Sequence, residues 1–304
     1  MDRIVAMQTF VRVAEAGSFT AVAGQLALAR SAVTRQIAAL EEHLGVKLIA
    51  RSTRRLSLTA EGAAYLSHCR DILDRIESAE DELAGRRGAA SGMIRASVPM
   101  SFGILHLMPL LAEFMARHPA VRMELDYSDR RVDLIEEGFD LALRIAAQLP
   151  ETQVARKISV CRSVVAAAPA YIERHGQPRH PDELSRHQCL CYSLAMRASW
   201  PFLIDGEARA VAVSGSLCAN NGEALQDAAI RGQGIVYLPT FIAARALRDG
   251  RLKPILGEFP LPEYHIYAAF PGNRFVPQRV RAFADFLARA FGPQPYWDRD
   301  LGLQ

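Results

Sequence analysis

Basic and hydroxyl side chains are concentrated in two short stretches of the first 60 residues, where they could contact a polyanion. The first stretch lies on one face of a helix expected over residues 31–44, because spacings of three and four residues bring side-chain tips together. It consists of Arg30, Ser31, Thr34 and Arg35. The second lies in a basic hairpin and consists of Arg51, Thr53, Arg54 and Arg55. Guanidinium groups hold phosphates or guanine edges and hydroxyls reach either, so both stretches favour a nucleic-acid partner.

Three short helices are expected to carry the first stretch. The first helix has apolar residues at steps of three and four, which are Ile4, Met7, Val11 and Ala14. Gly17 is expected to end it, and Ser18 to cap the second helix. Ser18 and Thr20, at the start of that helix, are further expected DNA contacts.

The third helix is expected to bury a stripe formed by Val33, Ile37, Leu40 and Leu44. Three short helices with one cationic face are typical of a helix-turn-helix that enters the major groove. The basic hairpin would then be a β-wing that follows the phosphate backbone. The alternative is an ordinary solvated bundle, since surface arginines are common.

The distribution of charge favours the DNA-binding interpretation. Residues 1–60 hold eight Lys or Arg and four Asp or Glu, a net charge of +4, whereas the whole chain carries +3. The excess of basic residues therefore lies in the segment expected to meet phosphate.

This segment resembles the N-terminal winged helix-turn-helix of LysR-type transcriptional regulators. The matching elements are Ser18-Phe19-Thr20-x-x-Ala23, the run Ser31-Ala32-Val33-Thr34-Arg35-Gln36-Ile37, Leu40-Glu41-x-x-Leu44-Gly45-Val46-x-Leu48, Arg51 and Leu58-Thr59-x-x-Gly62. The resemblance implies a dimer, or a dimer of dimers, whose paired helices read a pseudo-palindromic operator.

Two departures from the family pattern affect the helix that would read DNA and the wing. Ala29-Arg30 stand where the family usually has a hydroxyl residue and Gln, and Ile49 stands where it usually has Phe. Ala29 cannot cap the helix, a loss of about 1 kcal/mol. Arg30 adds a charge to the reading face, so the operator sequence is left open.

Length and composition indicate a globular protein of two or three domains, with 304 residues of which 50% are apolar. We find no apolar run long enough to span a bilayer and no apolar core of a signal peptide, so we expect a cytoplasmic protein without a membrane partner. The five cysteines have neither CxxC nor zinc-finger spacing and are expected to be reduced and mostly buried. Cys189-x-Cys191 is the one pair that raises a redox role, which the sequence leaves open.

A long helix is expected to begin after Thr59, its N-cap, with Glu61 in the first turn. Its apolar seam consists of Leu66, Cys69, Leu73, Ile76 and Leu83. About three heptads predict pairing with a second copy, and the alternative is packing on its own domain. Residues 85–92 are rich in glycine and are expected to form a hinge. We therefore predict a DNA-binding domain over residues 1–59 and a linker over residues 60–91.

Residues 92–304 alternate between expected strands and helices, which favours a mostly parallel α/β sheet. Strands are expected at 93–98, 121–127, 140–145, 159–168, 190–192, 200–204, 234–238 and 264–270. Helices are expected at 104–117, 132–137, 222–231 and 276–291. Residues 292–304 show no periodicity.

This region resembles the LysR-type effector domain. The matching elements are Phe102-Gly103, Leu107-x-Pro109, Phe114-x-x-x-His118-Pro119, Gly138-Phe139-Asp140-Leu141-Ala142-x-Arg144, Asn220-Asn221-Gly222-Glu223-Ala224-Leu225 and Gly232-x-Gly234-Ile235-x-x-Leu238-Pro239. The resemblance implies two Rossmann-like lobes, similar to those of periplasmic binding proteins, with an effector cleft between them. Lobe one would comprise residues 92–160 and 267–292, and lobe two residues 161–266.

Candidate effector contacts follow from that geometry, because open α/β sheets bind ligands at helix N-termini and at the carboxyl ends of strands. They are Ser101, Phe102, Ser128, Arg144, Asn220, Asn221 and Thr240. Structural roles remain as alternatives: Ser101 and Asn221 would only cap helices, and Arg144 would only form an internal ion pair.

An enzyme is disfavoured, because the one GxG lacks a third glycine and no GxSxG, HExxH, P-loop or CxxC is found. No cofactor and no metal ion are expected. The remaining alternative is a regulator whose α/β domain assembles without sensing a ligand.

The sequence therefore predicts an α/β protein with an N-terminal winged helix-turn-helix, a long linker helix and a two-lobed effector domain. We expect a ligand-responsive transcriptional regulator with a small, anionic or aromatic effector. Its expected partners are double-stranded DNA, the effector, further copies of itself up to a homotetramer, and RNA polymerase.

Overall fold

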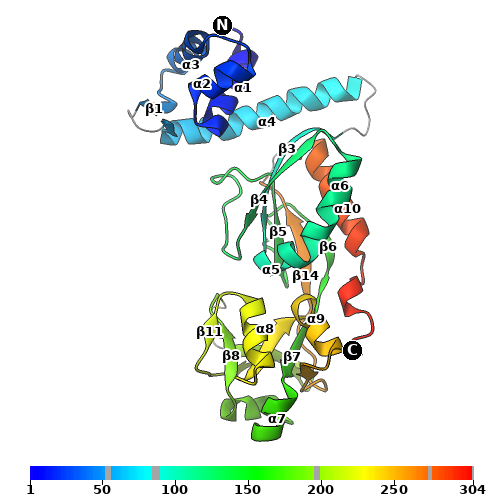
Figure 1. Ribbon diagram of the computed structural model, residues 1–304. Coiled ribbons are helices and arrows are strands. Elements are labelled where there is room, and N and C mark those ends of the chain that lie inside the picture. Colours follow the sequence, from blue (N-terminus) through cyan, green and yellow to red (C-terminus); the bar gives the residue numbers. More distant parts are fainter. Residues whose placement is uncertain (52–55, 84–89, 195–198, 273–275, 303–304) are drawn as a thin grey trace. The chain divides into compact units, whose positions relative to one another are not determined.

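A computed structural model describes residues 1–51, 56–83, 90–194, 199–272 and 276–302 (Figure 1). Contacts between residues divide the chain into two units. The first contains Met1–Ala89, Asp133–Gly138 and Asn273–Gln278, and the second contains Ala90–Val132, Phe139–Gly272 and Arg279–Gln304.

The first unit is built from helices and one hairpin. Its elements are α1 (Arg3–Ala16), α2 (Phe19–Gln25), α3 (Arg30–Leu44), β1 (Ile49–Arg51), β2 (Leu56–Leu58) and α4 (Ala60–Leu83). The expected stop at Gly17 is confirmed, since Gly17 ends α1 with a φ of 60°, a conformation that glycine adopts without strain. Thr59 caps α4 as expected, because its Oγ1 accepts a hydrogen bond from the Gly62 amide at 2.9 Å.

The core of the first unit confirms one expected stripe and corrects another. Val33, Ile37 and Leu40 of α3 are buried as expected, and Leu44 is half-buried against the same core. In α1, however, the buried residues are Ala6, Thr9, Phe10 and Val13. Ile4 is 43% exposed, so the predicted stripe is wrong: the buried face of α1 is rotated about the helix axis from the predicted one. Met7 and Val11 pack only along the edge of the core.

The first half of helix α4 packs on the core of the first unit. Cys69 is fully buried in the core and Leu66 packs against it, so these two seam residues are occupied within their own domain. Leu73 and Ile76 are half-buried and Ile72 is 40% exposed. The side chain of Leu83 and residues 85–89 of the expected hinge (85–92) lie outside the described residues, and Gly92 already belongs to a strand.

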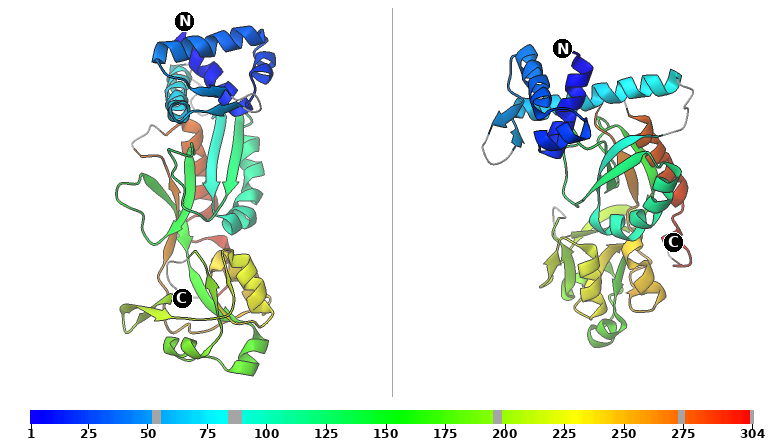
Figure 2. Two further views of the ribbon diagram at one scale, coloured as in Figure 1. Left: turned by 90° about the vertical axis from the view of Figure 1, so that its left-hand side faces the viewer. Right: turned by 45° about the horizontal axis from the view of Figure 1, so that its top comes forward.

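One lobe of the second unit is a five-stranded sheet with the order β4-β3-β5-β14-β6. Its strands are β3 (Gly92–Val98), β4 (Val121–Tyr127), β5 (Leu141–Ala146), β6 (Ala155–Cys161) and β14 (Tyr264–Ala269). Helices α6 (Met108–Arg117) and α10 (Gln278–Phe291) lie beside each other against this sheet (Figure 2). Phe114 of α6 contacts Phe283 and Phe286 of α10, which closes this side of the core. We call this part lobe one.

The other lobe, lobe two, is a sheet with the order β11-β8-β12-β7-β13. Its strands are β7 (Ser163–Ala167), β8 (Cys189–Tyr192), β11 (Cys218–Ala219), β12 (Ile235–Pro239) and β13 (Lys253–Pro254). The hairpin of β9 (Ser199–Ile204) and β10 (Glu207–Ala212) and the helices α7 (Pro169–His175), η2 (Pro181–Arg186), α8 (Gly222–Ile230) and α9 (Thr240–Arg248) complete it.

Several expected elements differ from the observed ones. Both sheets are mixed rather than mostly parallel, because β14 runs antiparallel to β5 and β6, and β12 runs antiparallel to β7. Residues 132–137 form a turn instead of a helix, in which Asp133 Oδ1 accepts from the Ile135 and Glu136 amides. The helix expected over 104–117 begins earlier, with α5 (Met100–Phe102) and the π-helical η1 (Gly103–Leu107). Within the described residues, no helix has the length and apolar character needed to cross a bilayer.

Candidate nucleic-acid interface and ligand site

Helices α2 and α3 form the helix-turn-helix. Ser18 Oγ accepts from the Ala21 amide at 3.2 Å, which confirms that Ser18 caps α2. The turn between the helices includes Ala27 at a positive φ of 51° and closes through a hydrogen bond from the Leu28 amide to the Ala23 carbonyl at 2.9 Å. The buried residues Val22 and Val33 then fix α3 against α2.

The side chains expected to read DNA face solvent. Arg30, Ser31, Thr34 and Arg35 are exposed, as is Thr20, whereas Ser18 is half-buried by its capping role. Thr34 Oγ1 donates to the Arg30 carbonyl at 3.0 Å, which leaves its lone pairs available. Within the described part of the chain, neither Arg30 nor Arg35 has an acidic partner. This face of α3 can therefore donate several hydrogen bonds to an external anion.

The N-terminus of α3 lacks the side-chain cap that the family pattern would supply. Ala29 is the N-cap residue and makes no side-chain hydrogen bond. The missing hydroxyl leaves backbone N–H groups at this end without a side-chain acceptor, and such groups bind anions well.

The wing is described only at its base. Strands β1 and β2 pair antiparallel from Ile49 opposite Leu58 to Arg51 opposite Leu56, so the expected hairpin is present. Thr53, Arg54 and Arg55 lie outside the described residues, and for Arg51 only the backbone is described.

A buried carboxylate connects α3 to this hairpin. Glu41 is 5% exposed, and its Oε1 accepts from the Leu48 amide at 3.0 Å and the Ile49 amide at 3.2 Å. Its Oε2 forms an ion pair with Lys47 Nζ at 2.6 Å. Burial alone would raise the pKa of Glu41, but Lys47 and the two amides outweigh it and lower that pKa. Glu41 thus fixes the start of the hairpin relative to α3.

In the second unit, two of the expected ligand residues meet across the lobes. Asn221 caps α8, because its Oδ1 accepts from the Ala224 amide at 2.9 Å. Its Nδ2 donates to Ser101 Oγ of α5 at 3.3 Å. Ser101 is 5% exposed, and the neighbouring Met100 places its sulfur 3.8 Å from the same Nδ2.

A second contact joins the lobes next to this one. Asp129 Oδ1 accepts from the Met100 amide at 3.0 Å, and the Asp129 carboxylate also binds the hydroxyl of Tyr192, at the end of β8. Burial, the negative charge of Asp129 and this hydrogen bond raise the pKa of Tyr192 to about 12. Tyr192 therefore stays neutral and donates to Asp129.

Ser128 lies at the carboxyl end of a strand, as expected, whereas Arg144 lies two residues before the end of its strand. Ser128 follows β4, and its Oγ accepts from the Arg130 amide at 3.3 Å. Arg144, on β5, is half-buried and places Nη1 3.2 Å from the Leu143 carbonyl and 3.5 Å from Ser97 Oγ. Asn220 is exposed beside Asn221.

Phe102 and Thr240 are fully buried, unlike the exposed Asn220 and the half-buried Ser128 and Arg144. Phe102 is 0% exposed and contacts Phe241, Phe291 and Trp297. Thr240 is 0% exposed, and both its amide and its hydroxyl donate to the Arg162 carbonyl, at 2.8 and 3.2 Å. These two residues stabilise the junction of the lobes from within.

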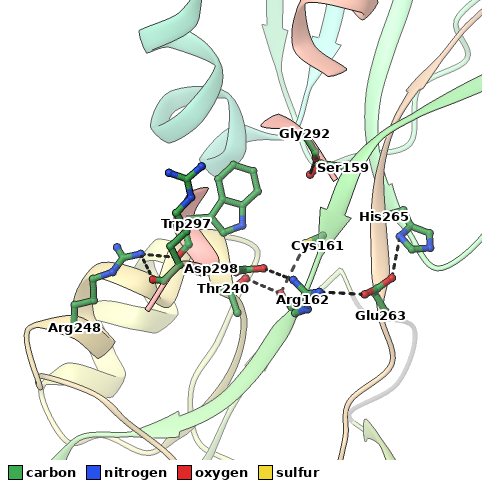
Figure 3. Close-up of polar contacts among 11 residues, drawn as sticks. Ser159, Cys161, Arg162, Thr240, Arg248, Glu263, His265, Gly292, Trp297 and Asp298 are labelled. Atoms are coloured by element: carbon green, nitrogen blue, oxygen red, sulfur yellow. Dashed lines mark hydrogen bonds and ion pairs between the residues drawn. The ribbon is translucent and has the colours of Figure 1, made fainter. Parts of the chain in front are cut away.

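The C-terminal segment reinforces that junction (Figure 3). Arg162 lies between β6 and β7, where the chain passes from lobe one to lobe two, and its Nη1 binds Asp298 at 2.9 Å. Arg248 of α9 donates to the carbonyls of Trp297 and Arg299 at 2.7 and 3.1 Å. Ser159 Oγ donates to the Gly292 carbonyl at 2.7 Å.

A buried histidine lies in the same junction. His106 of η1 places Nδ1 2.7 Å from the Tyr296 hydroxyl and Nε2 2.9 Å from the Phe241 carbonyl. Burial lowers its pKa, although the hydrogen bond to the Phe241 carbonyl acts in the opposite direction. His106 therefore acts as a neutral link between lobe one, α9 and the C-terminal segment.

Comparison with known proteins identifies both parts of the chain. Residues 4–63 match the family described as "Bacterial regulatory helix-turn-helix protein, lysR family", and residues 87–292 match the family described as "LysR substrate binding domain". The chain belongs to the LysR-type transcriptional regulators. Proteins of this family regulate transcription rather than catalyse reactions, bind DNA and small-molecule effectors, and form oligomers.

Full-length relatives share the LysR arrangement. The HTH-type transcriptional regulator CrgA of Neisseria meningitidis serogroup B is 36% identical over 289 residues, covering 94% of this chain and 96% of CrgA. Its solved structure matches with a TM-score of 0.59, over 93% of this chain and 97% of that one. The structure of the Vibrio cholerae virulence activator AphB matches with a TM-score of 0.58 and 30% identity, over 93% and 97% of the two chains.

Sequence reasoning missed several residues of this LysR-type regulator. Glu41 continues the buried stripe one turn after Ile37, which was a usable signal for a buried carboxylate. Asp129 and Tyr192 follow or end strands, and the same rule that selected Ser128 applies to both. His106 had no such signal, because its partners lie more than 130 residues away in the chain.

Proposed function

We propose that this LysR-type regulator binds a pseudo-palindromic operator as a dimer or dimer of dimers. The observation that carries the proposal is the exposed face of α3, where Arg30 and Arg35 stand beside hydroxyl groups with no acidic partner in the described residues. The protein would act in the cytoplasm, where bacterial DNA lies.

Pairing through α4 is supported by the part of the helix that its own domain leaves uncovered. Ile72 is 40% exposed, and Leu73 and Ile76 are half-buried. Two copies of α3 on a symmetric site would read twice as many bases as one copy. Sedimentation of the purified protein would distinguish the dimer from the tetramer.

The test of DNA binding compares two exposed arginines of the first unit. Genomic footprinting with the purified protein would first give the operator. Arg35→Ala should then weaken operator binding by about 1–3 kcal/mol and relax specificity at one base position. Arg12→Ala removes the same charge from α1. It should weaken DNA binding less, and by the same amount for every DNA sequence. Equal losses in the two variants would contradict a reading role for Arg35.

We further propose that the effector is a small anion or aromatic acid bound between the lobes. The N-terminus of the nine-residue helix α8 favours an anion, and the Arg144 guanidinium could pair with a carboxylate. Exposed Met100 offers an apolar contact for a ring. Ser101 and Asn221 would exchange their mutual hydrogen bond for bonds to the ligand.

The effector test uses two neighbouring asparagines. In a thermal-shift screen of small carboxylates, a bound compound should raise the melting temperature with its concentration. Asn221→Asp keeps a capping oxygen for α8 but removes the Nδ2 donor and adds a negative charge, so the shift should disappear. Asn220→Asp adds the same charge at the exposed neighbour and should keep most of the shift. Loss of the thermal shift in both variants would show that the added negative charge, rather than the missing Nδ2 donor, prevents binding.

The regulatory step would follow from closure of the lobes on the effector. A change in lobe position would alter the placement of paired α3 helices, DNA bending and access of RNA polymerase. The competing proposal is an α/β domain that only assembles the oligomer. A screen that yields no concentration-dependent shift in the wild-type protein would favour that second function.

A further inference from the structure

Two cysteines lie directly opposite each other at the edge of lobe two. Strand β11 pairs in parallel with β8, and in this register Cys218 is the partner of Cys191. Hydrogen bonds on either side fix the register, from the Cys191 amide to the Leu217 carbonyl at 3.0 Å and from the Ser193 amide to the Ala219 carbonyl at 2.9 Å.

This register brings the two thiols together. Paired residues on adjacent strands project from the same face, and their Cα atoms lie about 4.8 Å apart, within the range of about 4.4–6.8 Å that disulfides use. The two thiols lie close enough to influence each other's ionisation. Both cysteines are reduced in the structure.

The two cysteines differ in their access to solvent. Cys218 is exposed, whereas Cys191 is only 8% exposed and its Sγ lies 3.5 Å from the Cys189 carbonyl. Burial raises the pKa of Cys191, and the Cys218 thiol raises it further. An oxidant from solvent therefore reaches Cys218 first, and Cys191 is placed to react second.

We propose that Cys191 and Cys218 form an oxidisable thiol pair, which a hydroperoxide converts into a disulfide that ties β11 to β8. The Cys218 thiolate attacks the outer oxygen of the hydroperoxide, and the O–O bond breaks. The released alkoxide, or hydroxide for hydrogen peroxide, takes up a proton, and Cys218 becomes a sulfenic acid. The Cys191 thiolate then attacks the Cys218 sulfur, and the S–O bond breaks. Hydroxide leaves and takes up the proton lost by Cys191, so the two thiols together give two electrons to the peroxide.

The position of the pair gives it a route to the contact between the lobes. Three residues after Cys218, Asn221 caps α8 and donates to Ser101 of lobe one. Strand β11 is only two residues long and lies at the edge of its sheet, so few hydrogen bonds hold it. A disulfide at Cys218 would restrain the segment that carries Asn221. This consequence for effector response rests on the proposed function, whereas formation of the disulfide does not.

The test measures thiols in the full-length protein. The reduced chain has five cysteines, all titratable in denaturant. After brief treatment with a slight excess of hydrogen peroxide, two thiols should be lost, one cross-linked peptide should join Cys191 to Cys218, and dithiothreitol should restore all five. Cys218→Ser, at an exposed position, should lose no thiol under the same conditions. Cys191→Ser should leave Cys218 as a sulfenic acid that a 1,3-diketone traps.

Three results would overturn the proposal: a Cys218–Cys218 link between two chains, sulfinic acid at Cys218 with Cys191 still free, or loss of other thiols. Cys189→Ala serves as a control for the neighbouring thiol and should retain the loss of two thiols. The coupling to Asn221 predicts that amide hydrogen exchange over residues 219–225 slows on oxidation in the wild type and not in Cys218→Ser. Exchange rates that do not change on oxidation would show that the disulfide does not restrain the segment that carries Asn221. None of these measurements needs DNA or an effector, so their failure would leave the regulator function standing.

Discussion

The two units of the protein hold their polar side chains in opposite ways. In the first, Arg30 and Arg35 extend into solvent from a helix whose other face is fixed by the core. In the second, the side chains expected to meet the effector already bind protein groups, as Ser101 and Asn221 bind each other. On the proposed sites, DNA would meet a surface that needs little rearrangement, whereas an effector would have to replace existing hydrogen bonds. Substitutions on the exposed face of α3 should change binding alone, and those between the lobes should change binding and conformation together.

The largest expected loss of stability comes from a substitution at the junction of the lobes, which should leave the first unit folded. Phe102→Ala removes a fully buried ring from contacts with Phe241, Phe291 and Trp297, and should cost about 3–5 kcal/mol. Both tryptophans, Trp200 and Trp297, lie in the second unit, so urea unfolding followed by tryptophan fluorescence reports on that unit.

Phe10→Ala is the matched control, because Phe10 is equally buried in the first unit. It should leave the tryptophan transition in place. Equal shifts of that transition in both variants would show that the two units unfold together.

A smaller effect concerns the carboxylate that holds the wing to α3. Glu41→Gln keeps the shape but removes the charge that binds Lys47 and two amides, and should cost about 1.5–3 kcal/mol. The folded-state pKa of Glu41 is below its ordinary value of 4.5, so its stabilisation is complete above that pH. It is lost as the pH falls through the lower folded-state pKa.

Hydrogen exchange of peptides from residues 33–49, measured in the full chain between pH 6 and acid pH on the order of 3, would follow this loss. The wild type should lose more protection on acidification than Glu41→Gln. Glu42→Gln removes the neighbouring exposed carboxylate and should behave like the wild type. An identical pH dependence in all three proteins would exclude Glu41 as a titrating support of the wing.

The smallest expected effect is a gain in the stability of the first unit. Ala29→Ser would give α3 the side-chain cap that it lacks and should add about 0.5–1 kcal/mol to the stability of the first unit. Helix circular dichroism during thermal unfolding should show the increase. Ala29→Val, whose side chain carries no hydrogen-bond acceptor, is the control and should give little change. If Ala29→Ser were less stable than the wild type, the backbone amides at the N-terminus of α3 would already have other hydrogen-bond acceptors.

The local features of this chain were predictable because short-range chemistry determines them. Ser18, Thr59 and Asn221 cap helices by accepting from amides three residues further along the chain, and the α3 stripe follows the helical period. The α1 stripe was wrong because Ile4 and Phe10 are both apolar, and only packing against other helices decides which is buried. The buried position of Phe102 depends on Trp297, almost 200 residues later, which no local pattern reveals.

Trp297 also limits how the effector domain can change shape. It is 2% exposed among the rings of Phe102 and Phe291, while its carbonyl is bound by Arg248 of the other lobe. The lobes are thus fastened on the side of the C-terminal segment, so we expect them to part by rotating about it. In such a rotation the displacement of an atom grows with its distance from the axis. A small rotation at Arg162 would therefore move most the residues that lie farthest from the C-terminal segment.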